Sequence, residues 1–299
     1  MAKKAVKYYV VDAFTDSPFK GNPAAVCLLE EDRDEQWLQS VAAEFNLSET
    51  AYLTRTNGSD SQTPRFRLRW FTPVTEVRLC GHATLASAYT LFTTGMVNSG
   101  IIEFETLAGI LTAKKAPDFN SPIDASSRIE DPQNCFSVEL DFPIVPCTEF
   151  DPTEVSVSAI SKALNGADII DIKRAKPDDN FLVVLPSAKS VMELKPEIDD
   201  IRKYGAEGVI VSGAAPIESG FDFASRCFFP RNGIDEDPVT GSAHCTLAPY
   251  WSKKLGKCDL MAYQASARGG ILSVFLDEKN QRVLLRGKAI IAMEGTLMV

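Results

Sequence analysis

Two stretches of the chain decide its fold: Arg69-Trp-Phe-Thr-Pro73 and Arg226-Cys-Phe-Phe-Pro230, which repeat the pattern Arg-x-Phe-x-Pro 157 positions apart. Each copy is followed by a glycine and a run of small residues. These runs are Gly81-His-Ala-Thr-Leu-Ala86 and Gly241-Ser-Ala-His-Cys-Thr-Leu-Ala248. Each copy therefore predicts a strand, a proline-containing loop, a glycine turn and a helix, and the loop is three residues longer in the second copy. A repeat at about half the chain length predicts two pseudo-symmetric domains.

The sequence around both copies is rich in strand signals. Arg65 to Trp70 alternates strictly and places Phe66, Leu68 and Trp70 on one face, which is typical of a half-buried strand. Helices are predicted over 37–45, 84–95, 153–165, 188–204 and 245–255, with Pro196 interrupting the fourth. Residues 116–134 are rich in proline, asparagine and serine and predict an interdomain linker.

The composition excludes several classes of partner. The formal charge of −9 argues against a nucleic acid or an anionic membrane, because such surfaces repel an acidic protein that has no strong basic patch. The basic run Arg65, Arg67 and Arg69 is short and indicates a solvent-exposed face of a strand. The apolar runs are too short to span a membrane, and no signal peptide is visible. Seven scattered cysteines without a C-x-x-C pair indicate reduced thiols in a cytoplasmic protein.

The two predicted helix starts are suited to binding an anion. A buried helix start leaves backbone N–H groups without partners, and its partial positive charge favours a carboxylate. Gly81 and Gly241 would let a ligand approach the backbone, although each is also consistent with an ordinary turn glycine. We expect a substrate carboxylate between residues 81–84 and 241–244. The residues expected to bind it are Gly81, Ala83, Thr84, Gly241, Ser242 and Ala243.

The chain contains two histidines, and both lie at these helix starts. Cys80, His82, His244 and Cys245 could in principle bind zinc, but their spacing matches none of the usual tetrahedral patterns. No G-x-S-x-G elbow surrounds Ser242, and neither a phosphate loop nor a dinucleotide fingerprint occurs. We therefore predict no metal and no cofactor.

Two acidic residues near these motifs are candidates for proton transfer. Glu49 stands between the first helix and an apolar strand, where poor solvation would raise its pKa towards the range that suits proton transfer at neutral pH. Asp237 comes just before the second helix start. The plainer alternatives are a helix-end or surface glutamate and a turn or capping aspartate.

Taken together, these motifs resemble the phenazine-biosynthesis isomerase-like (PhzF-like) proteins of the diaminopimelate epimerase-like superfamily. The resemblance covers nearly the whole chain, and it depends on the order and spacing of several short motifs. The matching stretches are Val11-Asp-Ala-Phe14 with Gly21-Asn-Pro23, Asn46-Leu-Ser-Glu49, Phe71-Thr-Pro73, Gly81-His-Ala-Thr84 and Asp237-Pro-Val-Thr-Gly-Ser-Ala243.

The resemblance implies an α+β fold of two pseudo-symmetric domains, each a mixed β-sheet or barrel wrapped around a central helix, with the active site in the cleft between them. We place the domains at 1–118 and 119–288, with the last strand, about 289–299, returning to the first domain. The resemblance also implies no metal, no organic cofactor and often a homodimer. Glu49 matches the family's catalytic acid/base, His82 and Asp237 match the assisting polar residues, and Gly81 and Ser242 match the groups that hold the substrate.

One departure bears on the chemistry. Diaminopimelate epimerases use two cysteines, one before each glycine, whereas this chain has Cys80 at the first position and Thr240 at the second. Because a thiol/thiol racemase needs both groups, we favour a cofactor-independent isomerase in which Glu49 moves a proton on a small carboxylate substrate. The alternatives are an epimerase or racemase of a small amino or hydroxy acid, and a non-catalytic binding protein on the same scaffold.

Overall fold

A computed structural model describes residues 5–56, 63–119, 136–153, 155–176, 179–203 and 206–298. The chain forms two compact units. Unit 1 contains residues 1–142 and 284–299, and unit 2 contains residues 143–283. The C-terminal strand is thus in the same unit as the N-terminal part of the chain. Among the described residues, no helix combines the length and the apolar character that a membrane span requires.

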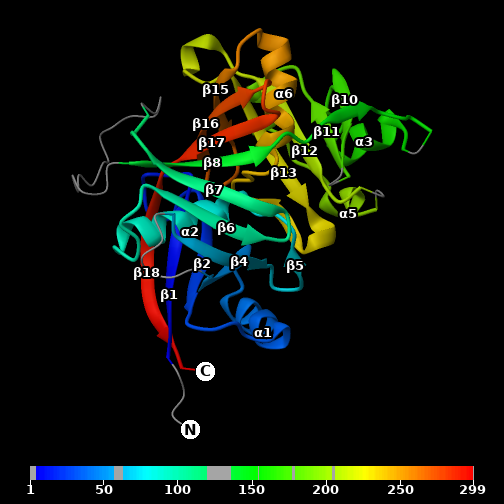
Figure 1. The fold of residues 1–299 in the computed structure, drawn as a ribbon. Coiled ribbons are helices and arrows are strands. Elements are labelled where there is room, and N and C mark those ends of the chain that lie inside the picture. The colour runs from blue at the N-terminus through cyan, green and yellow to red at the C-terminus, as the bar shows by residue number, and fades with distance from the viewer. Residues whose placement is uncertain are drawn as a thin grey trace. The chain divides into compact units, whose positions relative to one another are not determined.

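Unit 1 is a mixed sheet with two helices (Figure 1). Its strands and helices are β1 (Val6–Ala13), β2 (Asn22–Leu29), α1 (Glu35–Phe45), β3 (Glu49–Arg55), β4 (Arg65–Phe71), β5 (Glu76–Val77), α2 (Gly81–Thr93), β6 (Ile101–Thr106), β7 (Gly109–Ala116), β8 (Ser137–Pro143) and β18 (Ala289–Leu297). The β2–β3 and β4–β6 pairs are parallel, and the crossovers between them contain α1 and α2. The β18–β1, β1–β2, β3–β4, β4–β5, β6–β7 and β7–β8 pairs are antiparallel.

The central helix of unit 1 is α2, and the strands around it form the core. Every residue from Gly81 to Leu91 is buried, and α2 contacts β1, β2, β3, β7 and β18. Its polar side chains tolerate this burial because they bond to the carbonyl four residues earlier. Thr84 donates to the Cys80 oxygen at 2.5 Å, and Ser87 donates to the Ala83 oxygen at 2.7 Å. This arrangement confirms the predicted sheet wrapped around a helix.

Unit 2 repeats the same topology with different sequence. Its elements are β9 (Cys147–Glu149), α3 (Val157–Ala163), β10 (Asp171–Ala175), β11 (Asn180–Val184), α4 (Ala188–Met192), α5 (Ile198–Ile201), β12 (Val209–Ala214), β13 (Phe223–Phe229), β14 (Ile234–Asp237), α6 (His244–Leu255), β15 (Asp259–Gln264) and β16 (Gly270–Asp277), while β17 (Arg282–Gly287) spans the unit boundary. Short 3-10 turns at Ile217–Ser219 and Pro230–Asn232 complete it. β11–β12 and β13–β15 are the parallel pairs, and the neighbouring pairs are antiparallel.

The recurring Arg-x-Phe pattern has a structural cause in each unit. Arg69 binds Glu76 through two hydrogen bonds of 2.7 and 2.6 Å, and its guanidinium lies 5.0 Å from the centre of the Phe71 ring. Arg226 binds Glu236 in the same way, at 2.7 and 2.9 Å, and lies 5.2 Å from the ring of Phe228. A lysine in either place would lose both the two-pronged pairing with the glutamate and the stacking of the planar guanidinium on the ring. The extra residues of the second copy form the turn at Pro230–Asn232.

Several expected bounds differ from the structure. β8 pairs with β7 and so counts with unit 1, which puts the first change of unit after residue 142, whereas we expected it at 118. Most of the expected linker, 120–134, lies outside the described residues. The helix expected over 153–165 spans only Val157–Ala163, where Ser156 caps it. The helix expected over 188–204 is two short helices, α4 and α5, separated by a segment that contains Pro196.

Candidate functional site

The strand β3 begins at Glu49 and the helix α2 begins at Gly81, and these two starts bring Glu49 and His82 together. An Oε2 atom of Glu49 lies 3.2 Å from Nε2 of His82. The two side chains are only 10% and 3% exposed. Burial lowers the pKa of His82 to about 3, so its imidazole is neutral at neutral pH and can only donate or accept a hydrogen bond there. The structure thus brings together two residues that the sequence placed 33 positions apart.

Two further residues complete this cluster, and sequence reasoning did not single them out as site residues. Asn22 begins β2, is fully buried, and places its Nδ2 atom 3.1 Å from Nδ1 of His82. Ser48 precedes Glu49, and its hydroxyl donates to Oδ1 of Asn22 at 2.9 Å and lies 3.3 Å from Nε2 of His82. Both lie inside motifs that carried the family resemblance. That was the only signal in the sequence that pointed to them.

α2 begins at Gly81, and α6 begins at His244 after the turn 241–243. Both starts differ from those of α1, α3 and α4, although α5 also begins without a side-chain cap. Side chains cap α1, α3 and α4 through Asp34, Ser156 and Ser187. Neither α2 nor α6 has a side-chain cap.

The backbone N–H groups of 81–83 and of 241–243 find no acceptor among the described residues. Neither Gly81 nor Gly241 has a positive φ, so backbone conformation does not require glycine there. Because its N–H groups have no acceptor, each start can bind an anion.

In unit 2, Asp237 is held in a buried network. Asp237 is 5% exposed, and its Oδ2 accepts from the Thr240 hydroxyl at 2.5 Å. Gln264, which is fully buried at the end of β15, accepts from the Thr240 backbone N–H at 2.7 Å and donates to the Asp237 carbonyl at 2.8 Å. Gln264 thereby fixes the loop that leads to α6. No motif in the sequence pointed to it, because its partners lie 24 and 27 residues away, in the loop after β14 and at the end of that strand.

The second histidine has a different environment from the first. Nδ1 of His244 lies 2.9 Å from the Thr240 carbonyl, and its ring lies 5.9 Å from that of Phe223, a core residue of unit 2. Burial lowers its pKa to about 4. His244 therefore packs in the core of unit 2 and ties its own helix start to the preceding loop. Its Nε2 atom has no partner among the described residues.

The repeat shows where the two units carry different chemistry. In unit 1 Thr50 pairs with Phe71, and in unit 2 Val209 pairs with Phe228, so the position of Glu49 corresponds to Gly208. A Cβ atom on Gly208 would lie 2.2 Å from the Phe229 ring, which leaves no room for a side chain. By the same registers, Asp237 corresponds to a valine, Thr240 to Cys80 and Ser242 to His82. Unit 1 thus offers a buried glutamate where unit 2 cannot.

One group of side chains in unit 1 has atoms that could ligate a metal. Atoms of Glu49, Cys80 and His82 lie within 4.8 Å of one another. However, His82 faces Cys80 with Nδ1, at 3.4 Å, and faces Glu49 with Nε2. Because the two contacts use opposite ring nitrogens, an ion on either nitrogen would face only one of the other groups. The geometry fits a hydrogen-bonded network better than a metal centre.

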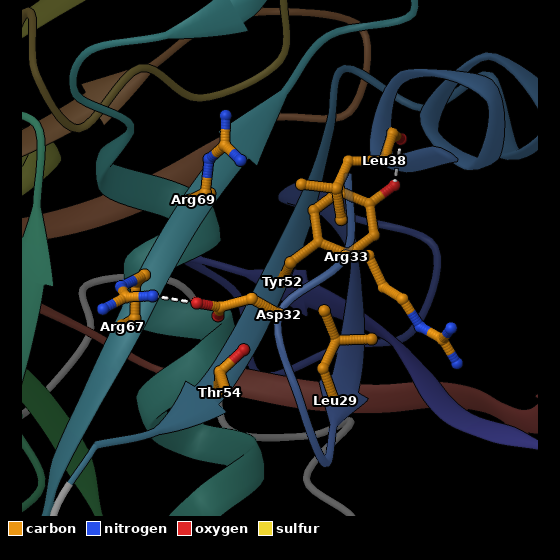
Figure 2. A pocket seen from close by; sticks show the side chains of 8 residues that line it. All are labelled: Leu29, Asp32, Arg33, Leu38, Tyr52, Thr54, Arg67 and Arg69. Atoms are coloured by element: carbon orange, nitrogen blue, oxygen red, sulfur yellow. Dashed lines mark hydrogen bonds and ion pairs between the residues drawn. The ribbon is translucent and has the colours of Figure 1, made fainter. Parts of the chain in front are cut away.

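A hollow on unit 1 carries the basic run that the sequence showed (Figure 2). Its lining residues are Leu29, Asp32, Arg33, Leu38, Tyr52, Thr54, Arg67 and Arg69. Arg67 pairs with Asp32, and Arg69 pairs with Glu76, so the carboxylates offset these charges. Side chains alternate along a strand, which puts Tyr52 and Thr54 on the opposite face of β3 from Glu49. The hollow is therefore separate from the Glu49 cluster.

Comparison with known proteins gives one consistent result. A family model described as "Phenazine biosynthesis-like protein" matches residues 11–295. An uncharacterized isomerase of Halalkalibacterium halodurans is 41% identical over 292 residues, which cover 97% of this chain and 98% of that protein. A crystal structure of a PhzF-family phenazine biosynthesis protein from Enterococcus faecalis has 35% identity and a TM-score of 0.81, with 99% of this chain and 100% of that one covered.

A more distant structure has the same fold. It is a hydroxyproline epimerase from Agrobacterium vitis with bound trans-4-hydroxy-L-proline. It has a TM-score of 0.60 at 13% identity, and 99% of this chain and 93% of that one are covered.

Proposed function

The chain belongs to the phenazine biosynthesis-like protein family and is an isomerase- or epimerase-type enzyme, and from this premise we propose that it moves a proton within one small carboxylate substrate. Glu49 takes the proton from one carbon and returns it to another position on the same molecule. The observation that carries this proposal is the buried contact of 3.2 Å between Glu49 and His82. A group that acts first as base and then as acid can perform both steps alone.

The difference between the units supports a single acid/base group. At the position that corresponds to Glu49, unit 2 has Gly208, and at the position that corresponds to Cys80 it has Thr240. Neither Gly208 nor Thr240 can act as the second base of a symmetric pair. An intramolecular proton shift needs only one such group, whereas inversion at one carbon needs an acid and a base on opposite faces.

The uncapped helix starts support a carboxylate as the bound group. Three N–H groups without acceptors among the described residues stand at each start, at 81–83 and 241–243. Such donors stabilise negative charge that builds up on the substrate during proton removal. The carboxylate contacts that we propose are those expected from the sequence: Gly81, Ala83 and Thr84 in unit 1, and Gly241, Ser242 and Ala243 in unit 2.

His82 and Asp237 are proposed to assist Glu49. A neutral His82 with its proton on Nε2 would place the positive end of that N–H bond 3.2 Å from Oε2 of Glu49 and so favour the charged carboxylate, which is the form that removes a proton. Asp237 is held by Thr240 and Gln264 and would orient a polar group of the substrate. The proposal includes neither a metal nor an organic cofactor.

An epimerase that uses Cys80 is the second candidate function. Sγ of Cys80 lies 3.4 Å from Nδ1 of His82, and a neighbouring imidazole can activate a thiol. The distant structure of the same fold is an epimerase. This candidate requires a second base that the helix start of unit 2 does not supply at Thr240.

The test is a screen of small hydroxy, amino and cyclic carboxylates in deuterated water, with product identified by NMR. The wild-type chain, Glu49→Gln and Glu139→Gln are compared. Glu139 is the matched control because its side chain is 10% exposed, as that of Glu49 is, but it pairs with Arg286. We expect a product with hydrogen at a new position of the substrate, as deuterium to the extent that the carboxyl of Glu49 exchanges with solvent before it returns the proton. Glu49→Gln should turn over on the order of 10²–10⁴ more slowly with little change in binding.

The outcomes separate the candidates. Deuterium at the original carbon with inverted configuration, together with a loss of turnover in Cys80→Ala, would establish the epimerase instead. If Glu49→Gln and Glu139→Gln both turn over at the wild-type rate, Glu49 is not the proton carrier. Equal losses in both variants would trace the effect to unit 1 stability.

A further inference from the structure

We propose that Asn22 and Ser48 are positioning residues that hold His82 in the tautomer with its proton on Nε2, the ring nitrogen that lies closest to Glu49. This inference rests on the proposed function of Glu49. Asn22 lies 60 residues and Ser48 34 residues before His82, and the packing of β2, β3 and α2 brings all of them together. Neither residue would contact the substrate carbon. Each would act through the imidazole.

The hydrogen-bond partners of Asn22 determine which ring nitrogen carries the proton. The Ser48 hydroxyl donates to Oδ1 of Asn22 at 2.9 Å, so the amide turns its Nδ2 atom towards the ring. Nδ2 can only donate, and it lies 3.1 Å from Nδ1 of His82. Nδ1 must therefore accept, and in a neutral imidazole the proton is then on Nε2.

Nε2 forms its hydrogen bond with Oγ of Ser48 and also lies close to the carboxylate of Glu49, although Oε2 of Glu49 is not in hydrogen-bond geometry with it. Oε2 of Glu49 lies 3.2 Å away, and Oγ of Ser48 lies 3.3 Å away. The Ser48 hydroxyl has given its proton to Asn22, so its oxygen accepts. With the opposite tautomer, the lone pair of Nε2 would face the carboxylate and oppose its negative charge. The hydrogen bonds from Ser48 through Asn22 to His82 thus place the proton on the ring nitrogen that lies 3.2 Å from the proposed acid/base group.

The second histidine provides an internal reference. Nδ1 of His244 lies 2.9 Å from the carbonyl of Thr240, and a carbonyl oxygen can only accept. His244 must therefore carry its proton on Nδ1, the opposite of His82. Because the chain has two histidines, the four ring nitrogens can be resolved in one spectrum.

The experiment is a long-range ¹H–¹⁵N correlation spectrum of the full chain labelled with ¹⁵N-histidine at neutral pH. We expect one histidine with its proton on Nε2 and one with its proton on Nδ1, and His82→Gln assigns the first. Asn22→Asp replaces the donor by an oxygen of nearly the same shape. It should move the His82 proton to Nδ1 and leave His244 unchanged. Turnover should fall at least about 10²-fold.

Ser48→Ala is the second variant, in case the aspartate disturbs folding. It removes the hydroxyl that orients the amide, so His82 should show a mixture of tautomers. Ser225→Ala is its matched control, since Ser225 is fully buried and its hydroxyl has no partner among the described residues. We expect the spectrum of Ser225→Ala to match the wild type.

A proton on Nδ1 of His82 in the wild type, or no change in Asn22→Asp and Ser48→Ala, would overturn the inference. The tautomer is measured without substrate, so its outcome is separate from that of the proposed function. If the tautomers are as expected but Glu49→Gln turns over normally, the proposed function fails and the positioning of His82 stands.

Discussion

The burial of both histidines predicts that acid destabilises this protein well before its carboxylates protonate. The pKa of His82 is lowered to about 3 and that of His244 to about 4, from an ordinary value of 6.5. In both cases burial is the main cause. At a pH between the ordinary value of 6.5 and these lowered pKa values, the histidines of the unfolded chain bind protons that those of the folded chain do not. The free energy of unfolding therefore falls as the pH falls below 6.5.

The magnitude follows from the two pKa values. Each histidine that is charged when unfolded and neutral when folded changes the stability by about 1.4 kcal/mol per pH unit. Between pH 7 and pH 5, each residue should therefore remove about 2 kcal/mol, and the pair about 4 kcal/mol. That loss is a large part of the 5–15 kcal/mol or so that is typical of a folded protein.

The assay is urea unfolding at pH 7 and pH 5 for the wild type and two variants. His82→Gln keeps a donor in the place of Nε2, and His244→Asn keeps a donor in the place of Nδ1. Each should reduce the loss between the two pH values by about 2 kcal/mol, whatever it costs at pH 7. Glu139→Gln, which leaves both histidines in place, should retain the full loss. If a histidine variant loses as much stability as the wild type between pH 7 and 5, that histidine titrates normally and is not buried as described.

Four other outcomes are expected. Cys80→Ala should cost about 1 kcal/mol of stability, because it removes one small buried group, and its turnover should stay within about threefold of wild type. A loss of turnover by several orders of magnitude at unchanged stability would instead support the epimerase that uses Cys80. Gln264→Leu leaves the buried N–H of Thr240 without its acceptor, so urea unfolding should show a cost of about 1–3 kcal/mol and turnover should fall as Asp237 loses its orientation; full turnover would make Gln264 purely structural. Sulfate or a dicarboxylate should compete with substrate and appear in a soaked crystal at 81–84 and 241–244, whereas density confined to surface arginines would contradict the anion sites. Melting temperature should not change with a chelator or a reductant, and a large drop with either would reveal a metal or a disulfide.

The sequence by itself determined the architecture of this protein, because hydrophobic periodicity and the repeated motif act locally. The alternation of Phe66, Leu68 and Trp70 placed the strand and its buried face, and the burial pattern of β4 agrees. The Arg-x-Phe repeat indicated two similar halves, and its cause, an arginine forked on a glutamate and stacked on a phenylalanine, is the same in both units. Its place at an apolar strand start singled out Glu49 as a candidate, with a surface glutamate as the alternative, and β3 begins there with Glu49 buried.

The partners of each polar side chain were decided only by the tertiary structure, because strand pairing and register join residues that the sequence keeps far apart. Asn22 meets His82 across 60 positions, and Gln264 meets Thr240 across 24. The two histidines have similar places in the sequence pattern, yet one faces Glu49 and the other packs beside Phe223. A periodicity of two or of 3.6 residues fixes the face on which a side chain lies. Which atoms meet on that face depends on how α2 and α6 pack against their own strands.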